Sequence, residues 1–129
     1  MTDITIDGLD HIVLTVADVE ATCEFYGRVL GFEPVCFDGE RVALVFGQQK
    51  INLHPVDNAY APKAKSPMLG AGDFCFISKT PMGDIISHLK DQGVEIIEGP
   101  GRRTGALGSI MSIYFYDLDG NLVEVSNYD

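Results

Sequence analysis

The alternation of apolar and polar positions predicts the same order of elements in both halves of the chain. In the first half, a β-branched run over 10–16 predicts a strand. Asp18 is a good N-cap for a following amphipathic helix, which Gly31 ends. Further strands are predicted over 34–37, 41–46 and 51–56, the first two joined by an Asp38-Gly39 turn.

The second half repeats this order. A strand is predicted over 73–78, and Thr80 with Pro81 predicts an N-cap followed by proline in the first helical position. The apolar stripe of the second helix consists of Met82, Ile85, Ile86 and Leu89, and Gly93 ends the helix. Three more strands are predicted over 94–98, 111–116 and 121–126.

This repetition predicts an α+β fold made of two paired βαβββ modules, over about 9–56 and 73–127, within a single domain spanning 1–129. A Pro/Gly-rich linker joins them. One module alone leaves a sheet face bare, so we expect the two to pair as a curved sheet around a central cleft that holds a metal or ligand. The alternative is a plain α+β sandwich with an accidental repeat, which the step-by-step match of elements disfavours.

Four polar residues stand at related positions in the two modules. Aligning the first strands puts His11 opposite Asp73, and aligning the last strands puts His54 opposite Glu124. Histidine and carboxylate ligands suit a divalent ion such as Zn, Ni, Co, Mn or Fe. A single strand histidine is more often structural, but the joint placement of all four predicts a metal site.

Two further residues are candidates for substrate binding. The segment 99–108 is predicted to be a flexible loop, and its Arg103 is suited to hold a carboxylate or phosphate of an anionic substrate. Arg102 beside it fits a solvated charge. Tyr114 shares a strand face with Tyr116, and either cleft lining or core packing accounts for it.

Composition limits the partners. With 9 Lys and Arg against 19 Asp and Glu, the net charge is −10, which disfavours nucleic acid and anionic membranes. Neither a signal peptide nor a membrane-spanning run is apparent, so a cytoplasmic location is expected. The three cysteines form no CxxC pair and are expected to be buried free thiols.

Three segments carry a family resemblance. The run 117–124 (DLDGNLVE) resembles the D-P-D-G-N-x-x-E ending of the vicinal-oxygen-chelate superfamily, which contains glyoxalase, bleomycin-resistance and dioxygenase proteins. The runs 9–16 (LDHIVLTV) and 25–32 (FYGRVLGF) resemble its opening strand and the end of its first helix. Within the superfamily, 103–115 and 124–128 resemble the branch called glyoxalase domain-containing protein 5, with virulence-associated bacterial members.

The resemblance implies paired βαβββ modules around a metal, often in a homodimer. His11, His54 and Glu124 match the ligand positions of the superfamily. Two residues depart from its pattern: Leu118 replaces the usual proline, and Asp73 stands where many members carry His or Gln. Because aspartate is short, Asp73 is left open between a ligand and a residue that orients a ligand or a metal-bound water.

The resemblance implies several reactions. The first is a glyoxalase-like lyase or isomerase acting through a chelated enediolate-type intermediate, with Glu124 or Asp73 as the catalytic base. An Fe(II) dioxygenase and a thiol transferase are alternatives on the same scaffold. A protein of a different class also stays open, a metal-free binding or sequestration module in which His11, His54 and Glu124 only line the cleft.

Overall fold

The computed structural model describes residues 3–129. Its elements follow one another as β1 (His11–Val16), α1 (Val19–Leu30), β2 (Glu33–Phe37), β3 (Arg41–Phe46), β4 (Gln49–Pro55), β5 (Asp73–Ile77), α2 (Met82–Asp91), β6 (Glu98–Gly105), β7 (Gly108–Tyr116) and β8 (Leu122–Tyr128). Each half therefore has the predicted βαβββ order.

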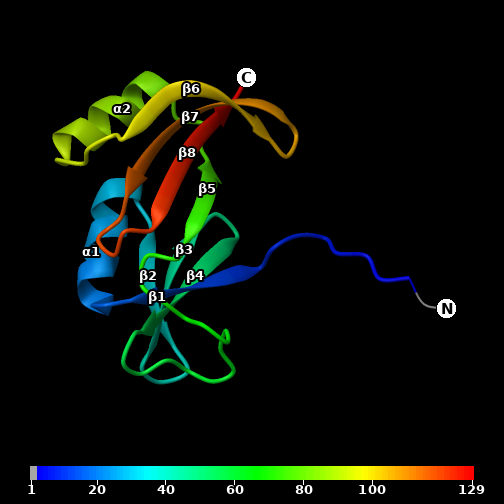
Figure 1. Cartoon of the computed structure of the whole chain (residues 1–129), viewed down its shortest axis with the longest axis vertical. Helices are drawn as coiled ribbons and strands as arrows, with labels where there is room; N and C mark the ends of the chain where they lie inside the picture. The colour runs from blue at the N-terminus through cyan, green and yellow to red at the C-terminus, as the bar shows by residue number, and fades with distance from the viewer. Residues whose placement is uncertain (1–2) are drawn as a thin grey trace.

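The strands form two mixed sheets of four, with orders β1-β4-β3-β2 and β5-β8-β7-β6. In each sheet the first strand of the module pairs in parallel with the last one, and the other pairings are antiparallel. The N-terminal module (β1–β4) lies below the C-terminal module (β5–β8) in Figure 1, with both helices on the same side. The α+β fold of two paired modules is confirmed.

The first helix is capped as predicted. The side chain of Asp18 accepts a hydrogen bond from the backbone N–H of Ala21 at 3.0 Å. At the other end, Gly31 adopts φ 73°, a left-handed conformation that costs glycine little. Thr22, Phe25, Tyr26 and Val29 are buried on one side of the helix.

The second helix begins differently from the prediction. Its N-cap position is Pro81, which offers no capping side chain, and the Thr80 N–H instead donates to Ser78 Oγ at 3.0 Å. The predicted N-cap role of Thr80 is therefore wrong. The buried stripe is confirmed, with Ile85 and Leu89 buried and Met82 and Ile86 packed against the core.

The prediction of a strand over 94–98 followed by a loop over 99–108 is wrong. Residues 94–97 form no strand, and β6 occupies Glu98–Gly105, paired antiparallel with β7. Its sequence EGPGRRTG has no apolar alternation, because this strand lies at the edge of its sheet and most of its residues are exposed. Pairing with β7 supplies the stabilisation that the side chains of β6 do not.

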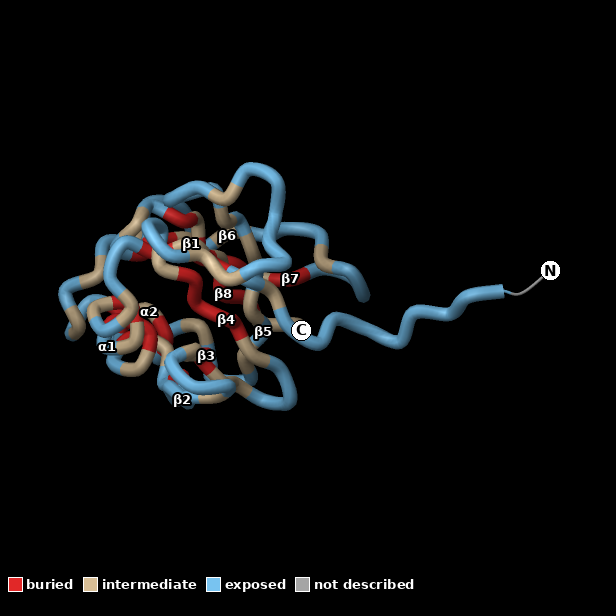
Figure 2. Tube along the Cα trace, turned by 90° about the horizontal axis from the view of Figure 1, so that it is seen from below, coloured by how far each residue is buried: buried red, intermediate tan, exposed pale blue. Residues whose placement is uncertain are grey.

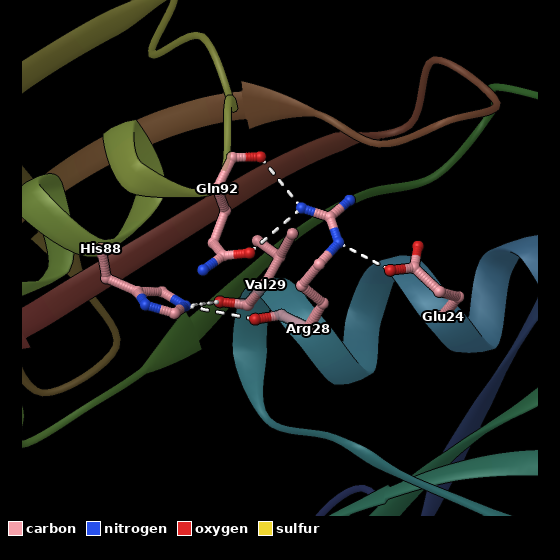
Figure 3. Close-up of polar contacts among 5 residues, drawn as sticks. All are labelled: Glu24, Arg28, Val29, His88 and Gln92. Atoms are coloured by element: carbon pink, nitrogen blue, oxygen red, sulfur yellow. Dashed lines mark hydrogen bonds and ion pairs between the residues drawn. The ribbon is translucent and has the colours of Figure 1, made fainter.

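Buried residues concentrate along β4 and β8 and where the helices face the sheets, whereas the N-terminal arm (residues 3–10) extends outward and is exposed (Figure 2). Figure 3 shows how the two helices are joined: His88 Nε2 lies 3.0 Å from the carbonyl oxygen of Val29, and Arg28 donates to the Gln92 carbonyl at 2.9 Å. Over residues 3–129, no helix is both long and apolar enough to span a membrane.

The D-L-D-G-N turn has a structural role. Asp117 Oδ1 accepts hydrogen bonds from the backbone N–H groups of Asp119 and Asn121, which closes the turn before β8. Its Oδ2 accepts from the buried Tyr26 hydroxyl at 2.6 Å, so the turn also fastens α1 to the C-terminal module. The most recognisable motif of the chain thus holds the two modules together.

Candidate functional site

Each sheet has one face turned towards the helices and one turned away, which we call its open face. Because side chains alternate along strands, the burial pattern and the register assign residues to each. The open face of the N-terminal module includes His11, Val13, Thr15, Arg41, Lys50, Asn52 and His54. That of the C-terminal module includes Asp73, Cys75, Ile77, Ser112, Tyr114, Tyr116, Glu124 and Ser126.

The strand register corrects the predicted equivalence of His54 and Glu124. In the C-terminal module, Glu124 lies opposite the residue two positions after Asp73. In the N-terminal module, the residue opposite the position two after His11 is Asn52. Asn52 is therefore the internal counterpart of Glu124. His54 lies two residues further along, at the position that Ser126 occupies in the other module.

The same register separates the two predicted histidine ligands. His11 pairs with Lys50, so His54 lies four residues further along the neighbouring parallel strand. Four residues cover about 13 Å of strand. Ligand nitrogens lie only about 2 Å from a bound ion, so two imidazoles that leave the same face at this separation are poorly placed to share one.

His11 is held in an orientation suited to a ligand. Its Nδ1 lies 2.8 Å from Asp10 Oδ2, and both side chains are partly or largely exposed. A carboxylate acceptor favours the tautomer with a proton on Nδ1, which leaves the lone pair of Nε2 free. Metal-binding histidines are commonly oriented by such an outer carboxylate.

His54 has a different environment. It is 3% exposed, its ring packs edge-on against Tyr60, and its Nε2 lies 3.5 Å from Arg41 Nη2. Burial, followed by the charges of Arg41 and Lys63, lowers the pKa of His54. The imidazole is thus held neutral beside a guanidinium whose positive charge also opposes a metal cation at this nitrogen.

Glu124 belongs to a polar network on the open face of the C-terminal module. Its Oε2 accepts from Ser126 Oγ at 3.4 Å, and the same hydroxyl lies 2.6 Å from the buried Ser112 Oγ and 3.2 Å from Cys75 Sγ. These neighbours restrict the orientation of the carboxylate. Partial burial of the sulfur, together with Glu124, raises the pKa of the Cys75 thiol despite its hydrogen bond to Ser126, which disfavours a nucleophilic thiolate.

Arg103 and Tyr114 meet beside this network. The Arg103 Nε donates to the Tyr114 hydroxyl at 3.0 Å, and its Nη2 lies 3.7 Å from Glu98. Tyr114 is directly opposite Glu124 in the register of β7 and β8. Burial, together with Glu124, raises the pKa of Tyr114 although Arg103 opposes the shift. The two predicted substrate-binding residues therefore lie next to the predicted carboxylate.

Asp73 is exposed at the start of β5, two residues before Cys75. The prediction of buried cysteines is wrong for two of the three, because Cys36 and Cys75 are exposed and Cys23 is partly buried. Among residues 3–129, no three His, Cys, Asp or Glu side chains converge closely enough in one chain to hold a metal ion. The predicted ligands are instead divided between the two open faces.

Sequence reasoning missed Asp10, Asn52 and Arg41. Asp10 directly precedes His11, a spacing that could have suggested an orienting carboxylate. Asn52 could have been found by aligning I-N-L (51–53) with V-E-V (123–125), which places Asn52 opposite Glu124. Arg41 gave no signal, since only the folded sheet brings β3 beside His54.

The geometry can be compared with known proteins. A sequence model of the Glyoxalase/Bleomycin resistance protein/Dioxygenase superfamily matches residues 8–125. The chain belongs to this superfamily. Virulence protein STM3117 of Salmonella typhimurium is 53% identical over 123 residues, covering 95% of this chain and 85% of that protein. Its crystal structure has a TM-score of 0.96 at 52% identity and covers 98% of this chain and 100% of that one.

More distant members of the superfamily carry named activities. Metallothiol transferase FosB of Staphylococcus epidermidis is 30% identical over 120 residues, covering 93% of this chain and 83% of that protein. The structure of fosfomycin resistance protein FosX from Listeria monocytogenes, complexed with Mn(II) and sulfate, has a TM-score of 0.68 at 22% identity. It covers 97% of this chain and 93% of that one and shares the fold.

Proposed function

We propose that this protein is a divalent-metal-dependent enzyme that acts as a glyoxalase-like lyase or isomerase on a small oxygenated substrate. The observation that carries the proposal is the 2.8 Å contact between His11 Nδ1 and Asp10, because it leaves Nε2 available on the open face. Glu124 supplies a carboxylate from the equivalent pair of parallel strands, β5 and β8, in the other module.

The donor set suits a divalent ion. Asn52 Oδ1 is buried without a hydrogen-bond partner, two residues on from Lys50, which pairs with His11. Imidazole, amide and carboxylate donors together suit Mn, Fe, Co, Ni or Zn. We therefore propose His11, Asn52 and Glu124 as ligands, with Asp73 either a ligand or an orienting group. His54 as a ligand stays a prediction that the same assay decides.

We further propose that a second copy of the chain completes the site. The open faces expose apolar side chains, with Val13, Ile77 and Tyr116 46%, 52% and 54% exposed. Residues Ile4, Ile6 and Leu9 of the N-terminal arm are more exposed still. Such surfaces are typical of interfaces between subunits. Pairing the N-terminal open face of one copy with the C-terminal open face of the other would bring the divided ligands together.

Each residue then has a defined task. A bound divalent ion acts as a Lewis acid that stabilises negative charge on substrate oxygens. Asp73 or Glu124 would accept a proton from one oxygenated carbon of the substrate and deliver it to the neighbouring oxygenated carbon. Tyr114 keeps its phenolic proton, since its pKa is raised, and donates a hydrogen bond to a substrate oxygen. Arg103 binds an anionic group of the substrate.

Metal content per chain, measured by elemental mass spectrometry, tests the site. We expect metal near one equivalent in the wild type and its loss in His11→Ala and Glu124→Gln. Glu98→Gln is the matched control and should keep its metal. Glu98 is an exposed carboxylate on the same sheet as Glu124, but it contacts Arg103 and is not a proposed ligand. Arg103→Ala should also keep its metal.

Two outcomes revise the proposal. If His54→Ala loses metal while Asn52→Ala keeps it, then His54 is the ligand. If the folded wild type stays empty when offered Mn, Fe(II), Co, Ni and Zn in turn, then the protein is a metal-free binding module. Removing metal with a chelator and restoring it should abolish and recover any activity of the enzyme.

Thiol transfer is the second candidate, because FosB, a metallothiol transferase by name, is 30% identical over nearly the whole chain. The two reactions differ in their co-substrate. A lyase or isomerase converts one substrate without consuming a free thiol, whereas a transferase consumes one thiol for each acceptor. Identifying the product separates them: a transferase converts fosfomycin and a thiol to a thioether, whereas an isomerase converts a 2-oxoaldehyde–thiol adduct to a 2-hydroxy thioester.

A further inference from the structure

Positively charged side chains gather on the open face of the N-terminal module, although the chain has a net charge of −10. The guanidinium of Arg41 lies 4.9 Å from the centre of the Phe37 ring and 5.0 Å from that of Tyr60. The Nζ of Lys50 lies 3.8 Å from the Phe37 ring centre. Cation–π contacts with two aromatic side chains thus hold these charges in place.

Arg41 has no anionic partner. The ion pairs among residues 3–129 involve His11, Arg28, Arg102 and Arg103, and none includes Arg41, Lys50 or Lys63. The Nε of Arg41 is buried and makes no hydrogen bond. An unsatisfied donor on a charged group is costly to bury, so its presence here calls for a ligand that supplies the acceptor.

Near these charges lies a pocket of about 650 Å³, which Lys63 lines and Arg41 and Lys50 do not. His54 and Thr15 line it from the sheet, His11 lies on the same wall, and Lys63 lines it from the linker between the modules. His54 is also the residue that Arg41 contacts, at 3.5 Å. The pocket wall therefore contains His11, His54 and the cationic Lys63, and Arg41 adjoins the pocket through its contact with His54.

We propose that Arg41, His54 and Lys63 form a binding subsite for an oxyanion, either a carboxylate or a phosphate group of a small molecule. Arg41 offers a planar fork of donors, Lys63 offers a point charge, and His54 offers a ring N–H. The subsite is separate from Arg103, which lies on the other module. As the anchor of a substrate in the metal cleft it rests on the proposed function, but anion binding itself needs no metal.

The subsite explains the position of His54. His54 lies four residues beyond Lys50, the residue that pairs with His11, and it contacts a guanidinium. It is therefore poorly placed to share a metal ion with His11. The same position is well suited to the far end of a substrate, with its oxygenated end at His11 and its anionic end at Arg41. We thus infer a substrate that carries a negative charge some distance from its reacting carbon.

Isothermal titration calorimetry on chelator-treated protein tests the subsite, with inorganic phosphate and malonate as probes at constant ionic strength. We expect binding of at least one probe, and phosphate against malonate distinguishes the two oxyanion classes. Arg41→Gln and Lys63→Gln should each weaken it by about tenfold. The matched controls are Arg102→Gln, which is paired with Asp129, and Lys65→Gln, which is exposed on the same linker but does not line the pocket.

Lys63→Gln keeps the test decisive if Arg41→Gln fails to fold, because Lys63 is an exposed linker residue. Absence of binding to wild-type protein overturns the proposal, as does equal weakening by the control variants. The probe could also bind only at protein concentrations too low for dimers to form. That result would mean that a carboxylate of a second copy occupies the cluster in the dimer, and it would also overturn the proposed subsite. If the protein binds the probe but no metal, the proposed subsite is supported and the proposed metal-dependent function is refuted.

Discussion

Asp117 shows how one side chain can serve both a turn and an interface. Its two carboxylate oxygens accept four hydrogen bonds, from the backbone N–H groups of Asp119 and Asn121, the Asn121 amide and the Tyr26 hydroxyl. A carboxylate so fully satisfied can be buried without a cationic partner. Asp117, at the start of the motif that reveals the family, therefore acts at the joint between the modules, whereas the proposed metal site involves Glu124 at its end.

Tyr26→Phe should lower the free energy of unfolding by about 1.5–3 kcal/mol, because it removes a short buried hydrogen bond to a charged group. Tyr116→Phe is the control, since Tyr116 is exposed and donates no hydrogen bond within the part of the chain that is described. Urea unfolding at neutral pH measures both. A loss for Tyr26→Phe no larger than that for Tyr116→Phe would contradict the structural role.

The pH dependence supplies a second readout. Burial, and then Asp117, raises the pKa of Tyr26 far above its usual range. The unfolded tyrosine releases its proton near pH 10, whereas the folded one keeps it. The unfolded state therefore binds fewer protons above about pH 10, and stability falls as the pH rises. Tyr26→Phe should reduce this alkaline loss, as urea midpoints between pH 8 and 11 would show.

At the scale of elements, helices with a clear apolar stripe and a capping residue could be predicted closely. Asp18 and Gly31 bound α1 in the sequence and in the structure alike. The strand β6 could not be predicted, since its polar, glycine-containing sequence is stabilised by pairing with β7 rather than by burial of its own side chains. Local patterns contain no information about such pairing.

Gly99 allows β6 to enter the sheet. It has φ 95°, and a Cβ there would come within 2.4 Å of the Ser112 carbonyl oxygen, at the irregularity in register between Glu98 and Gly101. Gly99→Ala should cost about 1–3 kcal/mol from backbone strain, before the steric clash is added. Gly101→Ala, where a Cβ meets nothing within 4 Å, should stay within about 0.5 kcal/mol of wild type. Thermal unfolding compares the two variants. Similar melting temperatures would contradict the claim that the irregular register between Glu98 and Gly101 requires glycine at position 99.

The candidate site was predictable in its chemistry and less so in its geometry. His11 and Glu124 stand out because the repeat places them on the first strand of one module and the last strand of the other. The role of His54 depends on its position two residues beyond Asn52, the counterpart of Glu124. It also depends on Arg41, which lies beside His54 only in the folded sheet. Residue type is written in the sequence, whereas the distance between two strand residues follows from pairing.

At the scale of the whole molecule, the two open faces differ in charge. Outside the anion subsite, the N-terminal face carries Lys50, and the C-terminal face carries Asp73 and Glu124. Opposite charge on two surfaces of the same chain favours a symmetric dimer. In this dimer, the N-terminal open face of each copy contacts the C-terminal open face of the other copy. The proposed pairing would make two equivalent sites per dimer, each with His11 from one copy and Glu124 from the other.

A mixing experiment decides whether the site is shared between copies. His11→Ala and Glu124→Gln should each form dimers without metal. If equal amounts are unfolded and refolded together, half of the dimers become hybrids, and each hybrid contains one site with both ligands intact and one with neither. Metal should therefore return to about one quarter of the wild-type content per chain. A site within one chain predicts no recovery, because every chain lacks a ligand, and refolding each variant alone controls for the procedure.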